Sequence, residues 1–161
     1  MANPFSINTL AQTNLRSDVK FLGEPSAHSN GIIFTYDTDL WIVSKEGGEA
    51  IRITGMEGEE SNPVFSPDGN WIAFTSNQYG NNDVYIMSTQ DRKITQLTFH
   101  QANDQVESWS WDSKKIYFSS NRYNRITTFE ISPEGGTPTR LFEHYHNTVH
   151  NLSEHPTSGD F

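Results

Sequence analysis

Four histidines near the end of this 161-residue chain are its clearest candidates for metal chemistry: His144, His146, His150 and His155. His144 and His146 are two residues apart, and such residues point to the same side of a β-strand, from which two imidazoles can bind zinc. The alternative is that all four are surface or turn histidines in a connection between repeats. We favour this second interpretation and assign neither a metal site nor a cofactor.

Five carboxylates in the first 60 residues could attract a cation or the basic end of a peptide: Asp37, Asp39, Glu57, Glu59 and Glu60. Runs of charged residues are usually solvated. We therefore expect these side chains to lie in exposed loops.

The other conspicuous polar and aromatic residues fit structural roles. Asp68 and Asp112 follow the ends of apolar stretches, where an aspartate can brace a turn. The tryptophans recur at matching places in a repeat, which favours core packing over ligand stacking: Trp41, Trp71, Trp109 and Trp111.

Signatures of catalysis are missing from the sequence. It contains no Gly-x-Ser-x-Gly elbow, no His-Glu-x-x-His motif, no EF-hand loop and no phosphate-binding loop. The Gly-Gly pairs in EGGEA (46–50) and EGGTP (134–138) are interpreted as hairpin turns. The chain has no cysteine, so disulfides and thiolate chemistry are excluded. We assign no catalytic residue, and the sequon at Asn151 matters only in a eukaryotic secretory route.

Charge and hydropathy narrow the partners. The chain carries 20 acidic against 11 basic residues, a net charge of −9, which disfavours nucleic acid and anionic membrane surfaces. It has no apolar run of about 18 residues that could span a membrane. The N-terminus does not resemble a signal peptide, which indicates a cytoplasmic protein if that end is native and a periplasmic one if a leader was removed.

A repeat of 44 residues organises the chain. The strings DLWIVSKEGGEAIRIT, DVYIMSTQDRKITQLT and TTFEISPEGGTPTRLF begin at residues 39, 83 and 127. Their third residues are all aromatic: Trp41, Tyr85 and Phe129. Self-similarity at this period is typical of repeat architectures such as β-propellers.

The second copy shows four short strands most clearly. NPVFS (62–66) alternates, residues 67–69 (Pro-Asp-Gly) form a turn, and WIAFTS (71–76) is apolar enough to be buried on both faces. DVYIMS (83–88) and KITQLT (93–98) complete the unit. This pattern predicts an all-β fold of four-stranded antiparallel propeller blades. An ordinary β-sandwich is the alternative, which the agreement of three copies disfavours.

The expected division of the chain is a lead-in segment at 1–20 and a partial β-propeller at 21–161. The blades are predicted at 21–60, 61–104 and 105–147, and a fourth is predicted to start at 148–161. About three and a half blades make an incomplete propeller, because a closed ring needs about four to eight. We therefore expect either a piece of a longer chain or association with a second copy that covers the open faces.

Four strings, at 39–54, 58–76, 80–88 and 104–122, resemble the N-terminal β-propeller of tricorn-type serine peptidases. The wider class includes TolB-like propellers and those of the prolyl oligopeptidase family. The resemblance covers about residues 20–161. It departs at residues 111–113, where Trp-Asp-Ser replaces Pro-Asp-Gly, and at TQDRK (89–93), which replaces a Gly-Gly turn.

The resemblance implies a non-catalytic domain whose peptidase active site lies downstream, outside this chain. Such a propeller would guide or filter peptide substrates toward that site and mediate assembly. A TolB-like module that binds protein partners is the alternative. The expected partners are peptide or protein substrates, with the rest of the propeller or a second copy of the chain, and no nucleic acid.

Overall fold

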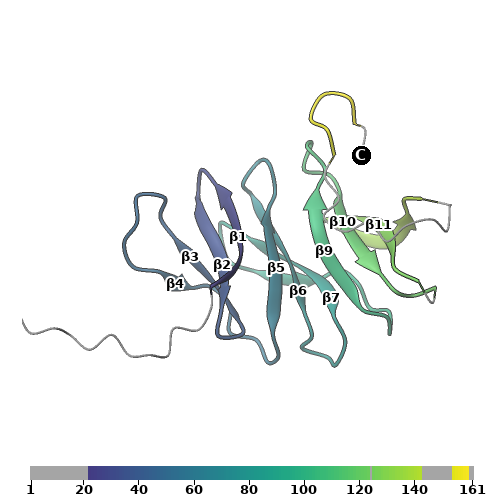
Figure 1. The fold of residues 1–161 in the computed structure, drawn as a ribbon, viewed down its shortest axis with the longest axis horizontal. Helices are drawn as coiled ribbons and strands as arrows, with labels where there is room; N and C mark the ends of the chain where they lie inside the picture. Colours follow the sequence, from purple (N-terminus) through teal and green to yellow (C-terminus); the bar gives the residue numbers. More distant parts are fainter. Residues whose placement is uncertain (1–21, 124, 143–153, 160–161) are drawn as a thin grey trace, which may run out of the picture.

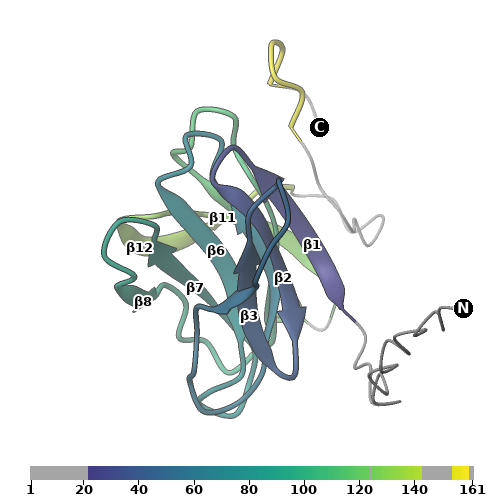
Figure 2. The ribbon, with the colours of Figure 1, turned by 90° about the vertical axis from the view of Figure 1, so that its left-hand side faces the viewer.

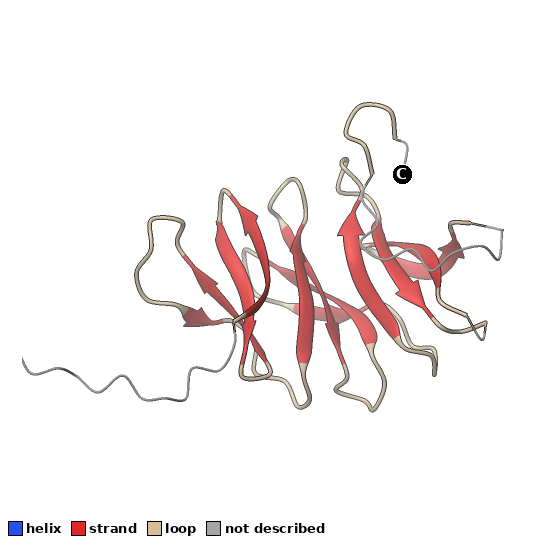
Figure 3. Cartoon of the chain, in the orientation of Figure 1, coloured by secondary structure: helices blue, strands red, loops and turns tan. Residues whose placement is uncertain are grey.

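The computed structural model describes residues 22–123, 125–142 and 154–159. These residues form β-strands joined by turns and loops, with no helix among them (Figure 3). The strands are β1 (Gly23–His28), β2 (Gly31–Tyr36), β3 (Asp39–Val43), β4 (Ile51–Arg52), β5 (Glu60–Phe65), β6 (Trp71–Ser76), β7 (Asp83–Ser88), β8 (Ile94–Gln96), β9 (Asp104–Trp109), β10 (Ile116–Ser120), β11 (Thr127–Ser132) and β12 (Gly135–Arg140).

The strands pair into three antiparallel four-stranded sheets, each in simple chain order. Blade 1 contains β1–β4, blade 2 contains β5–β8 and blade 3 contains β9–β12. The first strands of the three blades, β1, β5 and β9, lie side by side, and the other strands extend away from them (Figure 1). No sheet closes on itself within the described residues, so the predicted incomplete propeller is confirmed.

An aromatic pair recurs between the second and third strands of each blade. Trp41 lies opposite Phe34 in blade 1. The corresponding pairs, Phe74 with Tyr85 and Phe118 with Phe129, stack with ring centroids 5.7 Å apart in both cases. Residues that are 44 positions apart in the sequence therefore occupy the same paired position in successive blades.

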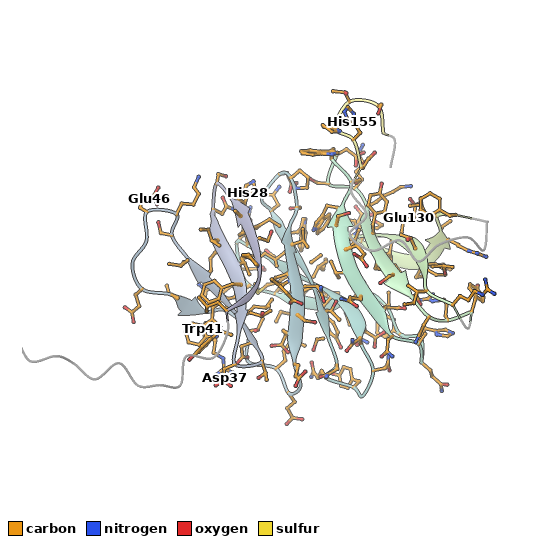
Figure 4. All side chains as sticks on the ribbon, in the orientation of Figure 1. His28, Asp37, Trp41, Glu46, Glu130 and His155 are labelled. Carbon is orange, nitrogen blue, oxygen red and sulfur yellow. The ribbon has the colours of Figure 1, made fainter. Side chains whose placement is uncertain are left out.

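Corresponding strands of the three blades have the same direction, so corresponding loops lie together at one or the other end of the molecule. One end is marked by His28 and the other by Asp37 in Figure 4. Figure 2, seen from the side of blade 1, shows the other blades stacked behind it. The N–H of Glu60 donates to the carbonyl of Thr38 at 2.8 Å at the Asp37 end. At the His28 end the links between blades include the N–H of Asp68 and the Ser113 hydroxyl at 3.1 Å.

The hydrophobic core lies between blades. Blade 2 has a neighbour on each side, and β7 accordingly buries five consecutive residues, Asp83–Met87. One cluster fills the space between blades 1 and 2: Ile33, Leu40, Phe65, Ile72, Phe74, Tyr85 and Met87. A second fills the space between blades 2 and 3: Ala73, Val84, Ile86, Leu97, Val106, Trp109, Ile116, Phe118, Phe129 and Ile131.

The turns between the first two strands of blades 2 and 3 are braced as predicted. The Asp68 carboxylate accepts hydrogen bonds from Ser66 Oγ and the N–H of Asn70 at 2.6 and 3.0 Å. In blade 3 the Asp112 carboxylate accepts the Ser110 hydroxyl at 2.7 Å. Gly69 has a φ of 71°, which glycine adopts without strain.

Other details of the repeat differ from expectation. Gly135, predicted in a turn, pairs with Ser132 as the first residue of β12. Of the predicted fourth blade, residues 154–159 form a turn. The lead-in segment at 1–20 lies outside the described residues.

Candidate functional site: the inner wall and the acidic blade junctions

The inner wall, formed by β1, β5 and β9, is the surface that lines the central channel in a propeller (Figure 1). The three strands read GEPSAH, ESNPVF and DQVESW. They contain four carboxylates and no lysine or arginine. Glu60 and Asp104 are buried, so the carboxylates that remain accessible on the wall are the exposed Glu24 and the half-buried Glu107.

A ladder of polar side chains crosses the wall. β1 and β5 each contain a bulge, where Glu24 and Asn62 have φ of 52° and 50°, a region that residues other than glycine seldom adopt. The Glu24 carboxylate accepts a hydrogen bond from the N–H of Asn62 at 2.6 Å. The Gln105 side chain donates to the side-chain oxygen of Asn62 at 3.1 Å. The bulges thus link three inner strands through their side chains.

Several backbone groups of the inner strands are already bonded to the preceding blade. The N–H of Phe65 donates to Ser26 Oγ at 3.2 Å, and the N–H of Val106 donates to Thr75 Oγ1 at 2.9 Å. An open strand edge readily pairs with another chain. Because these donors are occupied, contact with a passing polypeptide would fall mainly to side chains.

The first junction lies between blades 1 and 2 at the Asp37 end. Asp39 pairs there with Arg52, with Oδ2 and Nε 3.0 Å apart. Glu60 is only 2% exposed, and its Oε1 accepts the Ser76 hydroxyl at 3.3 Å. Its Oε2 is buried and has no hydrogen-bond partner among the residues that the structure describes.

The second junction is the equivalent place between blades 2 and 3. Asp104 is fully buried and pairs with Arg122, with Oδ2 and Nη2 2.6 Å apart. The neighbouring Asp83 accepts hydrogen bonds from Thr98 Oγ1 at 3.0 Å and from Gln96 Nε2 at 3.1 Å. Each junction therefore combines two carboxylates from adjacent blades with one arginine.

Burial shifts the acid–base behaviour of one carboxylate in each junction. Desolvation, with a further contribution from the charge of Asp39, raises the pKa of Glu60 to about 6. Burial is also the main cause that raises the pKa of Asp83, and the charge of Asp104 adds to it. In both junctions the affected acid is the one that lacks the arginine.

The junction carboxylates are buried and have their partners within the chain. No group of three or more His, Cys, Asp or Glu residues in the described part of the chain is placed to hold a metal ion. A helix capable of crossing a membrane is likewise missing from the described ranges.

The structure divides the predicted acidic group. Asp37, Glu57 and Glu59 are exposed, as expected for loops. The same expectation is wrong for Asp39 and Glu60, which are 9% and 2% exposed. Both begin a strand, β3 and β5, at a place where the adjacent blade covers them: blade 2 for Asp39 and blade 1 for Glu60.

The tryptophans also differ from one another. Trp109 is buried, and its Nε1 donates to the Val64 carbonyl at 3.0 Å. Trp41 and Trp71 are half-buried. Core packing is wrong for Trp111, which is 51% exposed because it lies in the turn after β9.

His144, His146, His150 and the sequon at Asn151 lie outside the described residues. His155 is exposed, and its Nδ1 lies 3.4 Å from the N–H of Thr157.

The sequence motifs did not predict the buried acidic junctions or the role of Arg122 in the second one. The 44-residue spacing could have found the acids, because each junction repeats the same three positions: Asp39 and Asp83, Thr54 and Thr98, Glu60 and Asp104. No comparable signal identifies Arg122, since Gln78 occupies its place in blade 2.

Antiparallel four-stranded blades with adjacent first strands define the chain as an arc of a β-propeller. Residues 19–156 match the model of the tricorn protease N-terminal β-propeller domain, and the chain belongs to this family.

Individual relatives agree with this assignment. Tricorn protease homolog 1 of Streptomyces coelicolor is 33% identical over 64 residues, which are 40% of this chain and 6% of that protein. The crystal structure of the tricorn protease superposes with a TM-score of 0.66 at 21% identity, over 76% of this chain and 13% of that one. TolB from Acinetobacter baumannii gives 0.62 at 23% identity, over 77% and 33%. The two structures show the fold, and the chain spans a third or less of each of these proteins.

Proposed function

We propose that this chain is part of a propeller that guides or filters unfolded peptides toward the active site of a tricorn-like serine peptidase. Its family membership supports attachment to a peptidase. The active site would lie outside these 161 residues, because the chain contains no recognisable catalytic motif.

The inner wall is the observation that carries the proposal. Its polar ladder through Glu24, Asn62 and Gln105 offers side-chain contacts to a polypeptide of any sequence. The bonded N–H groups of Phe65 and Val106 reduce the sites at which a peptide could be retained as an extra strand. A polypeptide held only by weak side-chain contacts, without strand pairing, can move along the wall and is not retained on it.

The proposal can be tested by narrowing the channel in the complete peptidase. This chain has no cysteine, so a single cysteine can be placed at Gln105 and alkylated with a bulky maleimide, other cysteines of the protein having been replaced. We expect slower hydrolysis of long unfolded polypeptides and unchanged hydrolysis of a short chromogenic peptide. The control places the cysteine at Glu46, which is exposed in the turn after β3.

Equal rates on long substrates for the two labelled proteins would refute guidance along this wall. A parallel loss on the short peptide would instead indicate damage to the active site, which the unlabelled cysteine variant would reveal.

A protein-interaction module is the second candidate, supported by three aromatic rings in loops at the Asp37 end. Tyr79, Phe99 and Tyr123 are 70%, 77% and 58% exposed. Serine at all three positions should then weaken assembly of the complete protein, measured by light scattering, while the label at position 105 has no effect on hydrolysis. Unchanged assembly would remove this candidate.

A further inference from the structure

A hollow of about 210 Å³ lies between blades 1 and 2 at the His28 end, opposite the acidic first junction. Its apolar lining comes from both blades: Ile42, Ile53, Phe65, Ile72 and Met87. Its polar lining comes from the loop after β1, from the last residue of β7 and from the loop that follows β7. An apolar floor with a few polar groups at the rim is the usual form of a small-molecule site.

Arg92 is the charged group on this rim. In the described part of the chain its guanidinium makes no hydrogen bond and no ion pair, although its backbone N–H donates to the Ser88 carbonyl at 3.0 Å. The carboxylate of the adjacent Asp91 accepts the N–H of Lys93 at 3.2 Å instead. A cation therefore borders the hollow without a bonded counter-charge.

The backbone of Arg92 is in a costly conformation. Its φ is 58°, in the left-handed region that favours glycine. The matching positions of blades 1 and 3 are glycines, Gly47-Gly48 in the turn after β3 and Gly135-Gly136 at the start of β12, all with positive φ. Blade 2 thus has an arginine where the repeat has glycine, and such strain often marks a functional position.

The neutral polar side chains on the rim already donate hydrogen bonds within the chain. The side-chain nitrogen of Asn30 donates to the Gly69 carbonyl at 2.8 Å. The Thr89 hydroxyl donates to the same carbonyl at 2.9 Å. Arg92 is therefore the rim group best able to select a ligand, and it selects an anion.

We propose that the hollow binds a small carboxylate that carries a branched aliphatic or aromatic group. The apolar group packs in the hollow against the half-buried Ile42 and Ile53, and the buried Ile72 and Met87 complete the lining. The carboxylate binds the Arg92 guanidinium, whose planar fork matches it in geometry and charge. The ligand is a free carboxylic acid or the last residue of a peptide, which share this chemistry. The proposal does not depend on the inner wall or on peptidase activity.

Titration of the chain with 4-methylvalerate tests the proposal, with the methyl signals of isoleucine and methionine followed by NMR. We expect saturable shifts for the methyl groups that line the hollow. The neutral amide of the same acid should bind roughly tenfold more weakly or worse, because it lacks the charge that Arg92 recognises. N-acetylleucine forms a second arm: tighter binding than 4-methylvalerate identifies a peptide end, and weaker binding identifies a free acid.

Arg92→Gly separates binding from folding. It restores the residue of the other two blades, so the midpoint of thermal unfolding should rise while affinity for the carboxylate falls by roughly tenfold or more. Lys93→Gln removes the same charge one residue away, outside the lining, and should bind as the unmodified chain does. Equal affinities for acid and amide, undiminished binding by Arg92→Gly, or no binding of either acid at millimolar concentrations would each overturn the proposal.

Discussion

The first and second junctions contain the same charges in different places. In the first, Arg52 neutralises Asp39 at a position where half of the arginine side chain is exposed. In the second, Arg122 neutralises the fully buried Asp104 and is itself only 11% exposed. Glu60, the equivalent of Asp104, has no arginine bonded to it in the first junction.

Arg122 is also held by more contacts than Arg52. Its guanidinium carbon lies 4.5 Å from the ring centre of Phe129, and its Nε donates to the Ser120 hydroxyl at 2.9 Å. The repeat therefore preserves the two acids of each junction but not the source of the compensating charge. Identical spacing in the sequence produces one tightly and one loosely compensated junction.

The largest effect should come from removal of Arg122. Arg122→Met leaves Asp104 charged, buried and unpaired, which costs about 3–5 kcal/mol of unfolding free energy. Arg52→Met removes a half-exposed partner and should cost about 0–1 kcal/mol. Urea unfolding of both variants at neutral pH measures the difference. Similar losses would show that the two junctions are equally compensated and would break the comparison.

The next largest effect is a dependence on pH in the first junction. The pKa of Glu60 is about 6 in the folded chain against an ordinary 4.5, so the native state binds this proton more tightly than the unfolded state. The contribution of this proton binding to the free energy of unfolding is fully present below about pH 4.5, and it is lost as the pH rises through about 6. The loss is about 2 kcal/mol.

Glu60→Gln isolates this contribution. The raised pKa of Asp83 acts in the same direction, but it is present in both proteins and cancels from their difference. We expect the variant to gain about 2 kcal/mol relative to the unmodified chain between pH 4 and pH 7.5, measured by urea unfolding. A difference that stays constant with pH would mean that Glu60 titrates normally.

Much of the fold could be predicted from local patterns. The expected strands at 71–76 and 83–88 match β6 and β7 residue for residue, because both are apolar and bounded by polar loops. The bulges at Glu24 and Asn62 could not be foreseen, since neither has the glycine that normally signals a positive φ. Register irregularities of this kind depend on the neighbouring strand, which the local sequence does not describe.

The site was less predictable than the fold. Asp39 and Glu60 looked like solvated loop residues, because burial of a carboxylate depends on the blade that packs over it. Arg122 lies in a polar loop, and only the folded chain brings its guanidinium to Asp104, 18 residues earlier. Charge compensation is a tertiary property, whereas strand pattern is a local one.

The smallest effect should come from moving the arginine of the second junction into the first. Gln78 stands 44 residues before Arg122, and Ser76 and Ser120 match in the same way. Gln78→Arg should therefore bring a guanidinium to Glu60, lower its pKa below 6 and stabilise the chain at pH 7.5 by about 1 kcal/mol. The gain is smaller than the loss from Arg122→Met because the new charge must itself be desolvated.

Gln78→Met is the matched control, since it supplies a side chain of similar length without charge. If the arginine and methionine variants unfold at the same urea concentration at pH 7.5, a side chain at position 78 does not reach Glu60. The match between positions 78 and 122 in the repeat would then not extend to their positions in the folded junctions. If only the arginine variant is stabilised, and the stabilisation fades as Glu60 becomes protonated below about pH 5, the missing charge is what distinguishes the first junction from the second.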